Sequence, residues 1–126
     1  MAGRGRSAAL PTLAAVDVRV EIISDGDGWV VATLRGDLDL SSLPALRRAV
    51  ASLPTADRGV IVDLDPVEVL EPEALGVLLG LAARLRRQGG DLRVVTTAEQ
   101  QLELLALTGV DRALRVHGSI AEAVDD

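Results

Sequence analysis

The alternation of apolar and polar residues near the start of the chain predicts a β-hairpin. Residues 16–23 alternate loosely and predict one strand, and residues 29–34 predict a second. Between them stands Asp25-Gly-Asp-Gly28, whose residue types are those of a tight turn. We therefore expect the chain to open with two antiparallel strands.

Three later segments have apolar residues that recur every three or four positions, which predicts amphipathic helices. The first helix begins after Ser41 and Ser42, which are both good N-cap residues, and has Pro44 in its first turn. The second ends at a pair of glycines, and the third spans residues 98–108. The positions predicted to face the core are Leu46, Ala49, Val50 and Leu53, then Leu75, Leu78, Leu79, Ala82 and Leu85, and finally Leu102, Leu105 and Ala106.

Short apolar runs separate these helices and predict the remaining strands. They cover residues 59–64, 91–96 and 114–116, and residues 119–124 predict a last short helix. Strands that alternate with helices pair in parallel through crossover connections, so the hairpin adds an antiparallel edge. The predicted fold class is α/β, with a mixed sheet of four or five strands and about four helices.

The length and composition indicate one domain with an aliphatic core. A chain of 126 residues suits a single domain, which we place at residues 16–126 behind a disordered tail at residues 1–15. Phe and Tyr are absent and Trp29, the only tryptophan, is expected to fill core space. No apolar run approaches the roughly 18 residues that a membrane helix needs. We expect a bacterial protein of the cytoplasm that does not insert into a membrane.

The chemistry that the composition allows is narrow. Without cysteine or lysine, and with His117 as the only histidine, the chain lacks disulfides, thiolate zinc sites, Schiff-base lysines and P-loops. We therefore expect no enzyme, no cofactor and no metal. The formal net charge of −6 disfavours nucleic acid as a ligand and favours a basic or mixed-charge protein surface.

Four segments of the chain match the motifs of one family in order. Residues 36–47 (GDLDLSSLPALR) are similar to its segment G-E-L-D-x-x-x-x-P-x-L-R, and residues 60–64 to its central strand. Residues 67–78 (VEVLEPEALGVL) align with V-x-F-L-D-S-S-G-L-G-V-L, and residues 104–112 are similar to its closing L-x-L-T-G-L-D. On these motifs the chain resembles the STAS domain family, of the anti-sigma-factor antagonist type.

The resemblance implies a regulatory protein–protein interaction module. In that family the antagonist binds an anti-sigma factor, a serine kinase that phosphorylates the second serine of D-S-S-G and so breaks the complex. Here Glu71, Pro72, Glu73 and Ala74 stand at those four positions, so the family serine is replaced by Glu73. Glu73 is interpreted either as a permanent phosphate mimic or as an ordinary residue of a helix start, and the two are compatible.

The same resemblance predicts a partner-binding surface and leaves its occupant open. The partner is an anti-sigma factor or related serine kinase, or the chain acts as a decoy for one. The alternative is an accessory STAS subunit of an ABC-type membrane transport complex, and the chain is either a monomer or a dimer. The predicted contact residues are Asp37, Asp39, Ser41, Ser42, Leu75 and Gly76.

Overall fold

The computed structural model describes residues 18–24, 26–54 and 56–126, so the predicted tail at 1–15 lies outside the described residues. One six-stranded sheet has the order β1-β2-β3-β5-β6, and β4 pairs with the end of β2. The elements are β1 (Arg19–Ser24), β2 (Trp29–Leu38), the 3-10 helix η1 (Leu40–Ser42), α1 (Leu43–Ala51), β3 (Gly59–Asp63), β4 (Val67–Leu70), α2 (Pro72–Arg87), β5 (Asp91–Val95), α3 (Glu99–Thr108), α4 (Val110–Ala113), β6 (Arg115–His117) and α5 (Ile120–Asp125).

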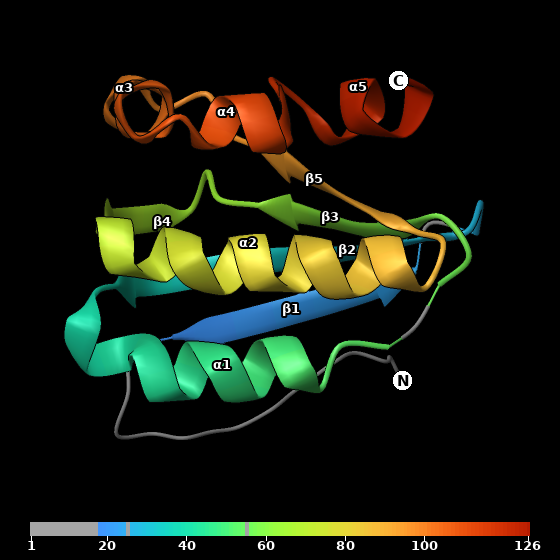
Figure 1. Ribbon diagram of the computed structural model, residues 1–126, viewed down its shortest axis with the longest axis horizontal. Helices are drawn as coiled ribbons and strands as arrows, with labels where there is room; N and C mark the ends of the chain where they lie inside the picture. The colour runs from blue at the N-terminus through green and yellow to red at the C-terminus, as the bar shows by residue number, and fades with distance from the viewer. Residues whose placement is uncertain (1–17, 25, 55) are drawn as a thin grey trace.

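The pairing of the strands confirms the predicted mixed α/β class. β1 and β2 form the antiparallel hairpin, in register from Arg19 opposite Arg35 to Ser24 opposite Val30. The other neighbours, β2–β3, β3–β5 and β5–β6, are parallel. In Figure 1, α1 and α2 lie side by side in front of the sheet, and α3, α4 and α5 lie along its upper edge. The parallel pairing follows because a helix connects each of these strands to the next.

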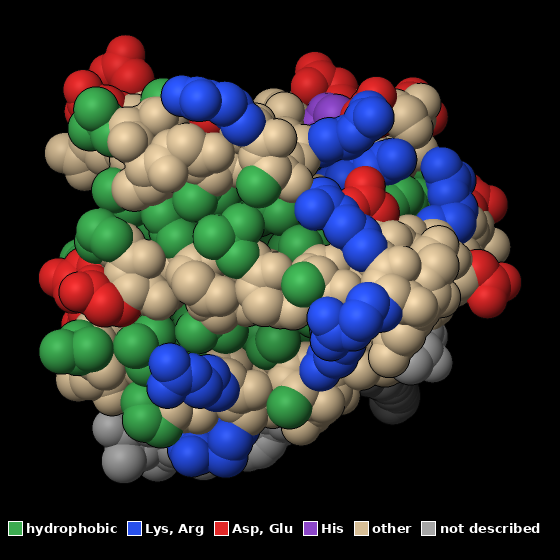
Figure 2. Space-filling view, in the orientation of Figure 1, with side chains coloured by type: hydrophobic (Ala, Val, Ile, Leu, Met, Phe, Trp, Pro, Cys, Tyr) green, Lys and Arg blue, Asp and Glu red, His purple; other side chains and the backbone are tan. Residues whose placement is uncertain are grey.

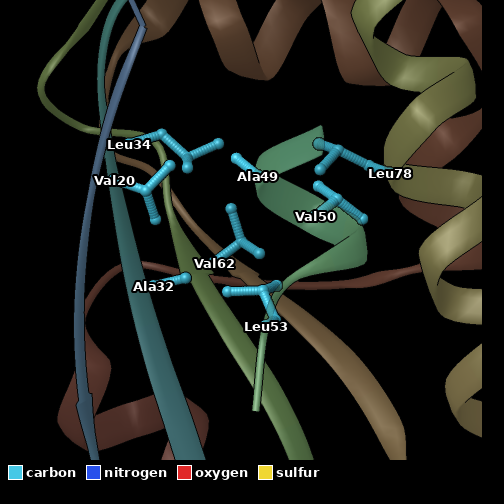
Figure 3. Close-up of a pocket in the computed structure, with 8 residues that line it drawn as sticks. All are labelled: Val20, Ala32, Leu34, Ala49, Val50, Leu53, Val62 and Leu78. Carbon is cyan, nitrogen blue, oxygen red and sulfur yellow. The ribbon is translucent and has the colours of Figure 1, made fainter. Parts of the chain in front are cut away.

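The main core lies between the sheet and the helices α1, α2, α3 and α4. Side chains alternate across β2, so Val30, Ala32 and Leu34 face this core. Figure 3 shows eight of its residues converging between the hairpin, β3, α1 and α2, around a residual cavity of about 10 Å³. That space is about one water probe, so the aliphatic core is closely packed and leaves no room for a ligand there.

A second, smaller core covers the opposite face of the sheet beneath α5. It contains Trp29, which is 1% exposed, together with Val31, Ile61, Val95 and Ala123. The prediction that Trp29 fills core space is therefore confirmed. The guanidinium carbons of Arg93 and Arg58 lie 4.5 and 5.2 Å from the centre of its ring, a favourable cation–π arrangement.

The structure adds elements that the sequence patterns did not predict and corrects one helix face. The strand β4 and the one-turn helix α4 were not predicted. On α3, Leu105 is buried as predicted, but Leu102 and Ala106 are exposed. The reason is Gln101, which occupies the core-facing position because its amide bonds inside the protein. On α2, Leu79 is also at the surface, and Leu81 takes a core position instead.

Candidate functional site

The end of β2 and the start of α2 meet at one edge of the molecule. The parallel ladder between β2 and β4 places Asp37 opposite Val69 and Leu38 opposite Leu70, with an irregular register between Gly36 and Asp37. The ladder continues into the connection, where the amide of Glu71 donates to the carbonyl of Leu38 at 2.9 Å. Two segments more than thirty residues apart are thereby joined, and we name residues 37–42 with residues 69–73 the acidic edge.

A reciprocal capping arrangement shapes the η1 part of the acidic edge. Asp39 Oδ1 accepts a hydrogen bond from the Ser42 amide at 3.1 Å, and Ser42 Oγ accepts one from the Asp39 amide at 3.0 Å. The Ser42 hydroxyl also donates to the Asp37 carbonyl at 2.7 Å. Asp39 is therefore the cap of η1, a 3-10 turn that was not predicted. Ser42 is the N-cap residue of α1, as predicted, although its side chain makes no capping hydrogen bond to that helix.

The pKa of Asp39 is lowered from its ordinary value. The largest cause is the hydrogen bond that the Ser41 hydroxyl donates to Asp39 Oδ1 at 2.7 Å, and bonds from Ser42 act in the same direction. These bonds favour the charged form of the carboxylate. Asp39 is accordingly an anion that is oriented by its two neighbouring serines.

The first turn of α2 presents Glu73 to solvent. Glu71 is the N-cap residue with an extended backbone and no side-chain cap, and Pro72 occupies the first helical position. Glu73 follows in the first turn with an exposed side chain. A carboxylate there is stabilised by the positive end of the helix dipole and by amide groups that lack helical partners.

Three predicted residues of the motif have no accessible side chain. Leu75 is 2% exposed and Ala74 is fully buried, because both lie on the face of α2 that packs on the main core. Ser42 is 3% exposed, since its hydroxyl is committed to the capping arrangement. Leu75 and Ser42, predicted as contact residues, therefore stabilise the edge from within. Gly76 is exposed, and a Cβ there would meet nothing within 4 Å.

The surface of the acidic edge combines negative charge with two exposed aliphatic side chains. Among the described residues, the carboxylates of Asp37, Glu71 and Glu73 take part in no ion pair or hydrogen bond. Leu40 is 64% exposed and Val69 is 40% exposed. The sequence patterns did not predict that either side chain is exposed. For Leu40 the reason is that the run Asp-Leu-Asp-Leu alternates and does not show which of its two leucines is buried.

Other binding chemistry finds little support in the described residues. No group of three or more His, Cys, Asp or Glu side chains in that part of the chain is arranged to hold a metal ion. Of the helices described, none has both the length and the apolar character needed to cross a membrane.

Comparison with known protein families identifies the family to which this fold belongs. The family model described as "Mlab, STAS domain" matches residues 25–117, which is most of the chain. The chain belongs to the STAS domain family. The matched region includes both segments of the acidic edge, so the STAS identification covers the surface described above.

Three proteins of known name are similar to this chain in sequence or in fold. The anti-sigma-B factor antagonist of Bacillus subtilis is 24% identical over 70% of this chain and 81% of its own length. The crystal structure of an anti-sigma factor antagonist from Mycobacterium paratuberculosis matches with a TM-score of 0.76 and 24% identity, over 86% of this chain and 92% of the other. The structure of the Bacillus cell fate determinant SpoIIAA, in its phosphorylated form, matches with a TM-score of 0.61 and 15% identity, over 85% of this chain and 97% of that chain. The two solved structures show the same fold as this chain, and two of the three similar proteins are named as anti-sigma factor antagonists.

Proposed function

We propose that this chain is a regulatory binding module that docks on an anti-sigma factor, or a related serine kinase, through its acidic edge. The observation that carries the proposal is the backbone ladder between β2 and β4. It joins Asp37 and Asp39 to Glu71 and Glu73 on one accessible edge, in a chain whose relatives are named antagonists of anti-sigma factors. Arginines of a partner pair well with the carboxylates of Asp37 and Asp39, because the guanidinium forms two parallel hydrogen bonds.

In this proposal Glu73 removes the family's phosphorylation switch. A glutamate has no hydroxyl to accept a phosphoryl group, so affinity for the kinase does not change with phosphorylation at this position. Its exposed carboxylate carries one negative charge, whereas phosphoserine carries about −1.5 to −2 and three acceptor oxygens. A carboxylate is therefore a weaker mimic than the modification it would imitate, and the module binds its partner with a reduced but constant affinity.

Isothermal titration calorimetry tests the proposal directly. The full chain is titrated against each anti-sigma factor encoded in the same genome, with and without ATP. Saturable binding to at least one of them is expected, and its affinity should not decline after incubation with ATP. If none of them binds, the proposed function is wrong. Binding to the ATPase subunit of a transport complex instead would support an accessory STAS subunit.

The role of Glu73 is tested with a matched pair of variants. Glu73→Ala removes the negative charge and should tighten binding by about tenfold if Glu73 opposes the partner as a phosphate would. Glu73→Ser should bind equally tightly at first, and then become phosphorylated and weaken when ATP is present. Glu99 also lies exposed in the first turn of a helix, α3, so Glu99→Ala is the control and should leave the affinity unchanged. Equal affinities for the Glu73→Ala variant and the unmodified chain would mean that Glu73 only begins the helix.

A further inference from the structure

Positive charge is concentrated on the two helices that cover the main core. The sequences of α1 and α2 contain five arginines and one carboxylate, in a chain of net charge −6. Figure 2 shows Arg side chains over α1 and over the C-terminal end of α2, whereas acidic side chains gather at the N-terminal end of α2. Arg47, Arg48 and Arg87 take part in no ion pair or side-chain hydrogen bond within the part of the chain that the structure describes.

A groove lies between the C-terminal ends of these two helices. Its volume is about 210 Å³, and its walls are mainly aliphatic with two polar side chains, Arg84 and Gln88. Arg84 is held in place because its Nη2 donates to the carbonyl of Val50 at 3.2 Å, which leaves its other donors for a ligand. An apolar cavity of about 150 Å³ can hold benzene, so this groove has room for one aliphatic side chain beside a carboxylate. The remaining lining residues are Ala51, Leu53, Pro54, Val60 and Leu85.

A second copy of the chain offers a matching group at its acidic edge. Leu40 projects from η1 with 64% of its surface exposed and directly follows Asp39 in the chain. Neither Asp37 nor Asp39 has a cationic partner among the described residues. We call residues 37–40 the acidic tip. It combines the aliphatic side chain and the negative charge that the groove and its arginine would accept.

The tip cannot reach the groove of its own chain. Helix α1 stands between them, and its nine residues span about 14 Å at a rise of about 1.5 Å per residue. Contact between tip and groove therefore requires two molecules. We propose that the acidic tip of one copy docks in the groove between α1 and α2 of a second copy, with Leu40 in the groove and Arg84 paired with Asp37 or Asp39.

The two surfaces of this contact differ, which gives the association a direction. Each copy in a pair keeps one tip or one groove free, so head-to-tail chains can grow with concentration. If the proposed function holds, association also covers Asp37 and Asp39 and competes with the anti-sigma factor. The association itself needs no partner protein, so it is tested separately.

Sedimentation velocity of the full chain tests the contact. The weight-average mass should rise with protein concentration at low ionic strength and fall again as salt screens the charges. Leu40→Ser disables the tip and Gln88→Glu places a negative charge in the groove, so each variant alone should remain a monomer. An equimolar mixture should form a 1:1 dimer, because one variant keeps the groove and the other keeps the tip.

Matched substitutions outside the contact serve as controls. Leu107 is 80% exposed on α3 and Arg112 is exposed on α4, so Leu107→Ser and Arg112→Glu should associate as the unmodified chain does. The proposal is overturned if the unmodified chain is monomeric at every concentration, which would leave the groove to a different acidic partner. It is also overturned if Leu40→Ser associates normally, or if the mixture of variants stays monomeric while circular dichroism shows both to be folded.

Discussion

Replacing Gln101 with alanine should loosen β4 and with it the acidic edge. Gln101 lies on α3 and is 6% exposed. Its Nε2 donates to the carbonyls of Leu64, at 3.0 Å, and Val67, at 2.9 Å, and its Oε1 accepts from the Thr96 hydroxyl at 2.6 Å. These bonds connect α3 to the end of β3, the start of β4 and the end of β5. Besides the backbone ladder to β2, the amide side chain of Gln101 therefore holds β4 in position beside Asp37.

The expected loss in the free energy of unfolding is about 3 kcal/mol. Alanine removes three buried hydrogen bonds, and a buried polar group that loses its partner costs about 1–3 kcal/mol. The losses are partly offset, because the Leu64 carbonyl also accepts from the Val67 amide at 2.9 Å. The void left by the amide adds a packing cost.

Urea denaturation followed by Trp29 fluorescence measures this loss, because the chain has one tryptophan and it is buried. Gln100→Ala is the matched control. Gln100 is the exposed neighbour on α3, and its removal should change the free energy by less than about 0.5 kcal/mol. Amide hydrogen exchange at residues 67–70 should also accelerate in the Gln101 variant. A difference between the two variants below about 1 kcal/mol would refute the reasoning.

Two further predictions concern the backbone and acid stability. Gly59 has φ +122°, and an ideal Cβ there would lie 1.9 Å from the Asp91 carbonyl oxygen, so Gly59→Ala should cost about 4 kcal/mol or prevent folding in the same urea assay. Gly76 is in an open helical position, so Gly76→Ala should instead raise the free energy of unfolding by about 0.5–1 kcal/mol. If the two glycine variants lost stability to a similar degree, the predicted clash at Gly59 would be contradicted. The pKa of Asp39 is lowered in the folded state, mainly by the hydrogen bond from the Ser41 hydroxyl. The charged carboxylate therefore stabilises the fold at pH values above its unfolded pKa of about 3.9. This stabilisation is lost as the pH falls through the lower pKa of the folded state. The urea midpoints of the unmodified chain and Asp39→Asn should therefore converge in acid, and a gap independent of pH would exclude this effect.

The accuracy of the sequence-based predictions varied along the chain for identifiable reasons. Hydrophobic periodicity found the long elements because a helix or strand that covers a core must repeat its apolar face. The four residues of β4 are too few for such a repeat, and they pair only with the end of β2. On α3, leucines at several positions satisfied the helical pattern. Gln101 decided the buried face through hydrogen bonds to residues more than thirty positions away, which no local pattern contains.

The features of the candidate site also fall into two groups, those that the sequence predicts and those that only the folded structure shows. The sequence by itself predicted that Glu73 stands in the place of the family serine and that a proline and acidic residues begin α2, because these are properties of single positions and their nearest neighbours. Only the tertiary structure decided that Leu75 and Ser42 are buried and that Leu40 is exposed. It also placed Asp37 and Leu38 beside β4, directly before the start of α2, and opened the groove at the far end of α1. Exposure and proximity depend on how distant elements pack, and a one-dimensional pattern carries no record of that packing.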